Sequence, residues 1–160
     1  MQDSFRNRIW HAIVLLLWGL WWGGLSFYAI VVVPVGTEQI GSVDQGFVTQ
    51  KVTLFHNALC VAMGLVLAIE AYRFSNRFLW INCGFLTFLT TLLFAGHVLL
   101  TSRMNFRDQT VPEGFYSQHA LYLWLTAIEW LYGLALPLIL LSTWQASEVK
   151  DSNSRSLSES

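Results

Sequence analysis

The amino-acid sequence predicts an all-α fold, an integral membrane protein built as an antiparallel bundle of four helices. Hydrophobic residues make up 54% of the 160 residues and charged residues only 12%, against about 45–50% and about 25% in soluble domains. The apolar residues gather into four segments, each long enough to cross about 30 Å of bilayer hydrocarbon as a helix. Because every backbone N–H and C=O in lipid needs a partner within the protein, segments of this length are predicted to be helices.

The predicted spans are residues 8–34, 46–72, 78–101 and 115–143. They form a transmembrane domain that covers residues 8–144, after a cytoplasmic segment at 1–7. The tail at 145–160 is rich in Ser and charge and has no apolar period, so we expect it to be disordered. The first span is much longer than the apolar core of a signal peptide, which has about 7–15 residues, and we expect it to be a retained helix.

Basic residues predict the orientation, because short cytoplasmic loops carry an excess of Lys and Arg. With both termini in the cytoplasm, six basic residues lie inside: Arg6, Arg8, Arg73, Arg77, Lys150 and Arg155. Three lie outside: Lys51, Arg103 and Arg107. The sequence therefore predicts a multi-pass protein of the cell (inner) membrane with cytoplasmic N- and C-termini.

Composition and motifs also restrict the function. A net charge of −1 provides no basic surface for nucleic acid. Two cysteines make neither a disulfide framework nor a zinc quartet. We find no Gly-rich phosphate loop, no Ser-His-Asp order and no paired carboxylates of a soluble active site, so no hydrolase or transferase is indicated. The expected partners are the lipid bilayer and either a second copy of the chain or another membrane subunit.

Small residues predict where the first helix meets its neighbours. Gly19 and Gly23 are four residues apart and Gly24 follows them, a spacing typical of close helix–helix contact in membranes. Trp18, Trp21 and Trp22 are then expected to cover the flanks of this contact or to face lipid.

Ionisable residues at membrane depth are costly, and each is a functional hypothesis by default. Counted from the helix ends, His97 and His119 lie at similar depth near the outer face, and His56 lies deeper. They are candidates for the axial ligation of haem, or, with His56, for holding a copper or zinc ion. The alternative is that each histidine hydrogen-bonds a Thr hydroxyl or a backbone carbonyl of a neighbouring helix.

Two acids fall within the predicted spans. Glu129, near the middle of the fourth, is a candidate for a proton or ion path, or for a structural hydrogen bond to a Thr such as Thr87 or Thr90. At the inner end, Glu70 and His11 are expected to pair across helices. The two cysteines of the chain, Cys60 and Cys83, are expected to be small packing residues.

Several motifs resemble a known family. They are Trp21-Trp22-Gly23-Gly24-Leu25-Ser26-Phe27, Pro34, Gln45-Gly46-Phe47-Val48, Lys51 and Gln118-His119. The chain resembles the small four-span membrane proteins grouped as domain of unknown function 4149, and more distantly the copper-resistance-D type of membrane domain. The resemblance implies a four-helix membrane bundle, and its copper link implies metal handling at the outer histidines. The chain departs from copper proteins in having no Met-rich or Cys-rich run.

The sequence thus supports three hypotheses. The first is a structural or assembly protein, or a small subunit, that acts through lateral helix contacts. The second is a haem- or metal-binding protein that uses His97, His119 and His56. The third is a proton or ion transport subunit that uses Glu129.

Overall fold

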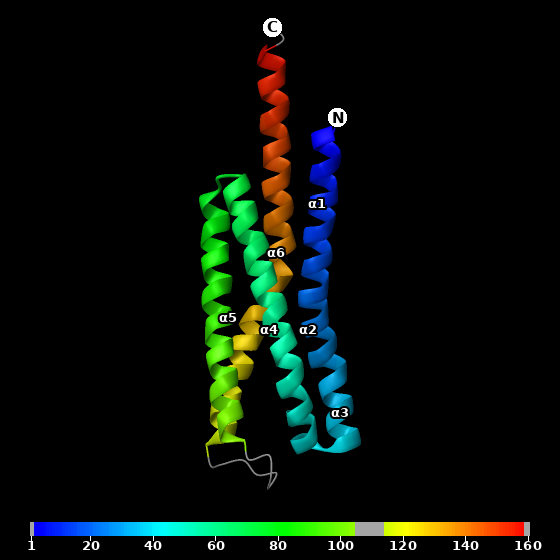
Figure 1. Cartoon of the computed structure of the whole chain (residues 1–160), viewed down its shortest axis with the longest axis vertical. Coiled ribbons are helices and arrows are strands. Elements are labelled where there is room, and N and C mark those ends of the chain that lie inside the picture. The colour runs from blue at the N-terminus through cyan, green and yellow to red at the C-terminus, as the bar shows by residue number, and fades with distance from the viewer. Residues whose placement is uncertain (1, 105–113, 159–160) are drawn as a thin grey trace.

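The structure, a computed structural model, describes residues 2–104 and 114–158, and its helices are joined there only by short turns (Figure 1). Side chains are described for residues 5–104 and 114–150. Four helices in this part of the chain are long and apolar enough to cross a membrane: Phe5–Ile40, Ser42–Arg73, Arg77–Arg103 and Phe115–Lys150. The predicted all-α fold is confirmed, and the four helices fit a multi-pass membrane protein.

The first span is helical to Ile40, beyond the predicted end at residue 34. It consists of α1 (Gln2–Trp18), the π-helical segment η1 (Gly19–Gly23), α2 (Gly24–Phe27), a second π-helical segment η2 (Tyr28–Val32) and α3 (Val33–Ile40). Proline inside a helix removes a hydrogen bond and crowds the carbonyl four residues earlier. Pro34 lies in the first turn of α3, just after the wider turns of η2, and the helix continues past it. The prediction that this helix ends at Pro34 was therefore wrong.

The connections on either side of the second span are very short. Gly41, with φ of 85°, separates α3 from α4 (Ser42–Arg73), so most of the predicted loop is helical. At the other end of α4, the chain reverses at Phe74–Asn76 into α5 (Arg77–Arg103). The side chain of Asn76 caps α5 by accepting a 2.8 Å hydrogen bond from the backbone N–H of Phe78.

The last helix, α6 (Phe115–Ser158), is longer than expected. It continues without a break through the segment that begins at residue 145, so the prediction of a disordered tail was wrong as far as residue 158. Ala, Glu and Lys in this segment favour a helix once the preceding turns have nucleated it. The connection between α5 and α6, with the predicted outer cation Arg107, lies outside the described residues.

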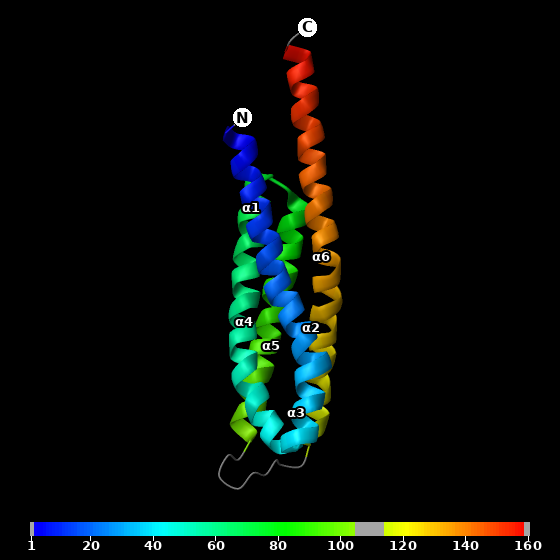
Figure 2. The same ribbon diagram turned by 90° about the vertical axis from the view of Figure 1, so that its right-hand side faces the viewer.

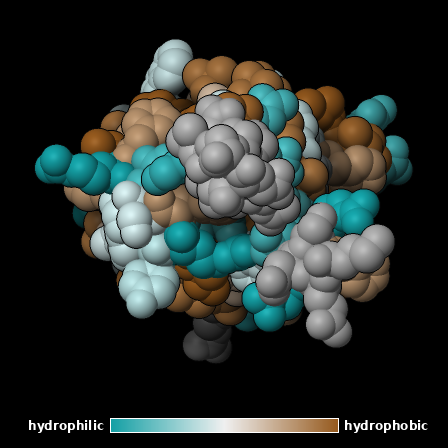
Figure 3. All heavy atoms as spheres, turned by 90° about the horizontal axis from the view of Figure 1, so that it is seen from above, coloured by the Kyte–Doolittle hydropathy of each residue, from teal (hydrophilic) through white to brown (hydrophobic). Residues whose placement is uncertain are grey.

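The helices alternate in direction around the bundle, in the order first span, α4, α5, α6, and the first span also contacts α6. Both ends of the described chain lie at the same end of the bundle as the α4–α5 turn (Figures 1 and 2). Seen from that end, hydrophilic side chains gather on the end face, while hydrophobic ones show around the sides (Figure 3). This distribution is the one expected for a bundle with its sides in lipid.

The predicted contact at the small residues of the first helix is not formed within the described chain. A Cβ at Gly19, Gly23 or Gly24 would have no described neighbour within 4 Å. The close approach occurs instead at Gly133 of α6, where a Cβ would lie 2.4 Å from Cδ1 of Trp22. Within the described chain, bulky indoles, and not these glycines, face α6, so packing at the three glycines stays a prediction for contacts with another chain.

Candidate functional site

A buried group of polar side chains lies where η1, α4 and α6 meet. The carboxylate atom Oε1 of Glu129 accepts hydrogen bonds from the indole Nε1 of Trp21 at 3.0 Å and from the Cys60 thiol at 2.8 Å. The Nε2 atom of His56 lies 3.0 Å from the same oxygen. Trp21, Cys60 and Glu129 are at most 1% exposed, and the His56 side chain is 14% exposed. We call these four residues the buried cluster.

Local helix geometry places each member. His56 and Cys60 are one turn apart on α4 and therefore share a face, with Sγ and Nε2 3.5 Å apart. Trp21 lies in η1, where the chain contacts both α4 and α6. Its Nε1 also lies 3.1 Å from the Cys60 sulfur, so one indole N–H points between the thiol and the carboxylate.

Three members of the buried cluster have the chemistry of metal ligands. One ligand atom each from His56, Cys60 and Glu129 lies within 4.8 Å of the other two. Imidazole nitrogen, thiolate sulfur and carboxylate oxygen are the donors that zinc takes in proteins. The second carboxylate oxygen of Glu129, Oε2, is buried and has no hydrogen-bond partner among the described residues. That oxygen leaves the carboxylate with further capacity to bind a cation.

The sequence predicted the importance of Glu129 but not its partners. Thr87, one expected partner, donates instead to the backbone carbonyl of Cys83 at 2.8 Å. Cys60 was expected to be a packing residue, and Trp21 was expected on a helix flank or facing lipid. The prediction for Trp21 was wrong, because its indole is buried and donates to Glu129. Cys60 does pack in the hydrophobic core, but its thiol also donates to Glu129, which the sequence did not predict. One signal was available, since Val14, Trp18, Trp21 and Leu25 follow the 4-3-4 spacing of a buried helix face.

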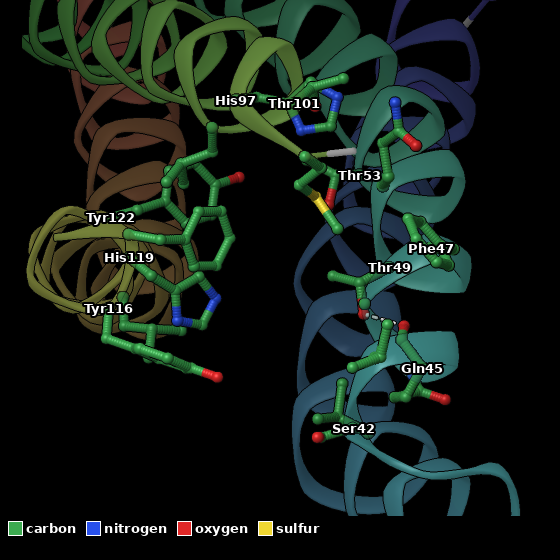
Figure 4. Close-up of a pocket in the computed structure, with 18 of the residues that line it drawn as sticks. Ser42, Gln45, Phe47, Thr49, Thr53, His97, Thr101, Tyr116, His119 and Tyr122 are labelled. Carbon is green, nitrogen blue, oxygen red and sulfur yellow. Dashed lines mark hydrogen bonds between the residues drawn. The ribbon is translucent and has the colours of Figure 1, made fainter. Parts of the chain in front are cut away.

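The three predicted histidines do not share one site. His97 and His119 line a pocket of about 330 Å³ between α4, α5 and α6, near the end opposite the termini (Figure 4). His119 stacks on Phe115, with ring centroids 5.8 Å apart. His56 is a member of the buried cluster and does not line this pocket. The hypothesis of one site formed by all three histidines was therefore wrong.

A second buried acid, Glu70, lies near the end of the bundle that carries the termini. It is fully buried and accepts hydrogen bonds from the indole of Trp10, from the indole of Trp144 at 2.6 Å and from Arg73 at 3.0 Å. His11 stacks on Trp144 with ring centroids 3.8 Å apart, and its Nε2 has no hydrogen-bond partner among the described residues. The predicted direct pair of His11 and Glu70 is replaced by contacts of both residues with Trp144.

Fold and site together define a class of protein, a four-helix bundle of membrane-spanning type with a buried His-Cys-Glu cluster inside it. The chain matches no family model, and no curated protein and no solved structure shows significant similarity to it. The resemblance to the family of domain of unknown function 4149 and to the copper-resistance-D domain therefore stays a prediction.

Proposed function

We propose that this membrane protein binds one divalent transition-metal ion, Zn²⁺ in the first place, through His56, Cys60 and Glu129. The observation that carries the proposal is the convergence of the three ligand atoms to within 4.8 Å of one another inside the bundle. The hypothesis of a metal-binding protein is thus kept, but its site moves from the outer histidines to the buried cluster.

Charge balance favours a divalent ion. An ion in a low-dielectric interior is costly unless the charges around it cancel. With a Cys60 thiolate, a Glu129 carboxylate and a neutral His56, a divalent cation makes a site of zero net charge. A Cu⁺ ion, or a haem held by the outer histidines, would leave the buried Glu129 without such compensation.

Ligand geometry also favours zinc. Zn–S bonds measure about 2.3 Å and Zn–N or Zn–O bonds about 2.0 Å, so tetrahedral ligand atoms lie a little over 3 Å apart. The distances of 2.8, 3.0 and 3.5 Å within the buried cluster need only small adjustments. Three protein ligands leave a fourth position for water or another molecule, as in catalytic zinc sites. The Trp21 indole would donate to the liganding atoms and orient them.

The other hypotheses have less support. A proton path from Glu129 would need a chain of proton donors and acceptors, but the hydrophobic core of the bundle contains Met63, Leu67 and Leu136, which have no proton to donate. A purely structural role would not require a thiol, an imidazole and a carboxylate to converge in the bundle interior. The buried cluster therefore favours metal binding over both alternatives.

The excess of basic residues around the termini and the α4–α5 turn supports cytoplasmic N- and C-termini and an inner-membrane location. In that orientation the pocket lined by His97 and His119 is near the outer face of the membrane, and the Glu70 contacts are near the inner face.

The test is a metal analysis of the full chain, purified in detergent without chelator and then loaded with Zn²⁺ or Co²⁺. We expect about one ion per chain, and a sulfur-to-cobalt charge-transfer band with Co²⁺. His56→Ala, Cys60→Ser and Glu129→Gln should each lose the ion. Cys83→Ser is the matched control and should retain it, because Cys83 lies outside the buried cluster.

Cys60→Ser keeps a hydroxyl that can donate to Glu129, so circular dichroism and size-exclusion chromatography should show an intact fold. The proposal would be overturned if the wild type held no metal after incubation with Zn²⁺ or Co²⁺, or if the cobalt band persisted in Cys60→Ser. The structural hypothesis would then be the best remaining account of the buried cluster.

A further inference from the structure

The pocket between α4, α5 and α6 is separate from the proposed metal site and has its own chemistry. We propose that it binds the ring head of an uncharged isoprenoid quinone, with the lipid tail extending into the bilayer. The proposal goes beyond metal binding and does not depend on it.

The pocket exists because α4 and α6 diverge toward the end of the bundle opposite the termini. From α6, Tyr116, His119 and Tyr122 face the side chains of Gln45 and Thr49 on α4 across the opening (Figure 4). A Cβ at Gly96 of α5 would lie 3.1 Å from the ring of Tyr122, so a glycine at this position lets that ring pack against α5.

Hydrogen bonds organise the α4 side of the pocket. Gln45 is only 4% exposed and donates to the Tyr28 hydroxyl at 3.2 Å, which donates to Thr49 at 2.9 Å. The carboxamide oxygen of Gln45 lies 1.8 Å from the position that a Cβ on Gly36 would take. A side chain at position 36 would therefore displace the carboxamide of Gln45 from this wall.

The lining selects an uncharged ligand that accepts hydrogen bonds. Among the described residues that line the pocket, none carries a fixed charge. The polar groups that line it include imidazoles of His97 and His119, phenols of Tyr116 and Tyr122, and hydroxyls such as that of Thr101. An anionic lipid headgroup would find no Lys or Arg among these residues. A quinone carries two carbonyl oxygens on opposite sides of its ring, and the two imidazoles lie on different helices.

Aromatic side chains and the size of the pocket also fit a quinone ring. Phe47 and Phe115 line the pocket together with the two tyrosines, and flat rings pack well against aromatic faces. A volume of about 330 Å³ is near the lower end of the range for small-molecule sites, roughly 300–1,000 Å³. The pocket therefore suits a single substituted ring, and the tail would have to lie outside it among the lipid chains.

The experiment is a titration of the full chain in detergent with decylubiquinone, followed by quenching of tryptophan fluorescence, with decyl alcohol as the control for the tail. We expect saturable binding of the quinone only. The double variant His97→Phe/His119→Phe keeps two aromatic rings but removes the imidazole donors, and should weaken binding about tenfold. Tyr72→Phe, an exposed tyrosine toward the opposite end, should bind like the wild type.

Quinone binding that is not saturable, that is matched by decyl alcohol, or that is unchanged in the double variant would overturn the proposal. The Cys60→Ser variant distinguishes the two proposals, because it should lose the metal and keep quinone binding. Size-exclusion chromatography of the double variant shows whether the bundle is intact. Tyr122→Phe is a milder change in the same pocket and should also weaken quinone binding.

Discussion

The indole Nε1 of Trp18 donates a 2.7 Å hydrogen bond to the backbone carbonyl of Gly133. In a regular helix that carbonyl would accept from the N–H four residues later, but this position is Pro137, which has none. The first span thus supplies the donor that the proline removes from α6. One turn further along the first span, Trp22 donates to the carbonyl of Trp130 at 2.9 Å, so two indoles attach the first span to the backbone of α6.

We first predict that the stabilising effect of Trp18 depends on Pro137. Trp18→Phe should lower the free energy of unfolding by about 0.6 kcal/mol and at most by about 1.7 kcal/mol, the mean and maximum measured for hydrogen bonds between membrane helices. In a Pro137→Ala background the carbonyl gains a helical donor, and the same substitution should cost clearly less. Reversible unfolding in mixed detergent micelles measures both values as a double-mutant cycle. Trp80→Phe, at a half-exposed tryptophan, is the control, and equal costs in the two backgrounds would contradict this interpretation.

We next predict opposite effects of alanine at two sets of glycines. Gly133→Ala should destabilise the bundle by about 1–3 kcal/mol, because the new Cβ would overlap the ring of Trp22. Gly19→Ala and Gly23→Ala introduce a Cβ into open space, and should be neutral or stabilise by up to about 1 kcal/mol through helix propensity. Thermal unfolding of the three variants in one detergent compares them directly. If Gly19→Ala and Gly23→Ala were instead less stable than Gly133→Ala, Gly19 and Gly23 would be a packing surface, for instance between copies of the chain.

Glu70 should be a strong determinant of stability at the termini end. Glu70→Ala would leave the N–H groups of Trp10 and Trp144 without their acceptor, and we expect a loss of about 1–3 kcal/mol for an unpaired buried donor. Glu70→Gln keeps an oxygen acceptor and should lose less. Glu38→Gln, at an exposed acid of α3, is the control. Unfolding curves that coincide for Glu70→Ala and the wild type would show that these contacts contribute nothing to the stability of the bundle.

Metal affinity should fall as the pH is lowered. Ligands bind a metal only in their deprotonated form, so protons compete with the ion for the Cys60 thiolate and the His56 imidazole. Zn²⁺ titrations at pH 8 and pH 6 should therefore give tighter binding at pH 8, with protons released into a weakly buffered solution. An affinity independent of pH would show that neither the thiol nor the imidazole is a ligand.

The left-handed backbone at Gly41 gives a last prediction. This residue has φ of 85° and ψ of 160°, a region that is open essentially to glycine alone. Gly41→Ala should cost about 1–3 kcal/mol and disturb the reversal between α3 and α4. Gly84→Ala is the control, because Gly84 is an exposed helical glycine with open space around its Cα. Comparable stability of the two variants would contradict this account.

The sequence by itself determined the fold class, because the length and apolarity of the four segments permit only helices in lipid. It also predicted the α4–α5 turn and identified Glu129, Glu70 and the histidines as unusual for their depth. These conclusions need only composition and counting along the chain, which do not depend on how the helices are rotated.

Only the tertiary structure decided which of these residues meet. The rotation of each helix brings Trp21, His56 and Cys60 to Glu129, and separates His56 from His97 and His119. These rotations result from contacts between residues far apart in sequence, such as the indoles of the first span on the carbonyls of α6. The apolar segments carry small and aromatic residues on several faces, so their periodicity alone could not select the face that is buried.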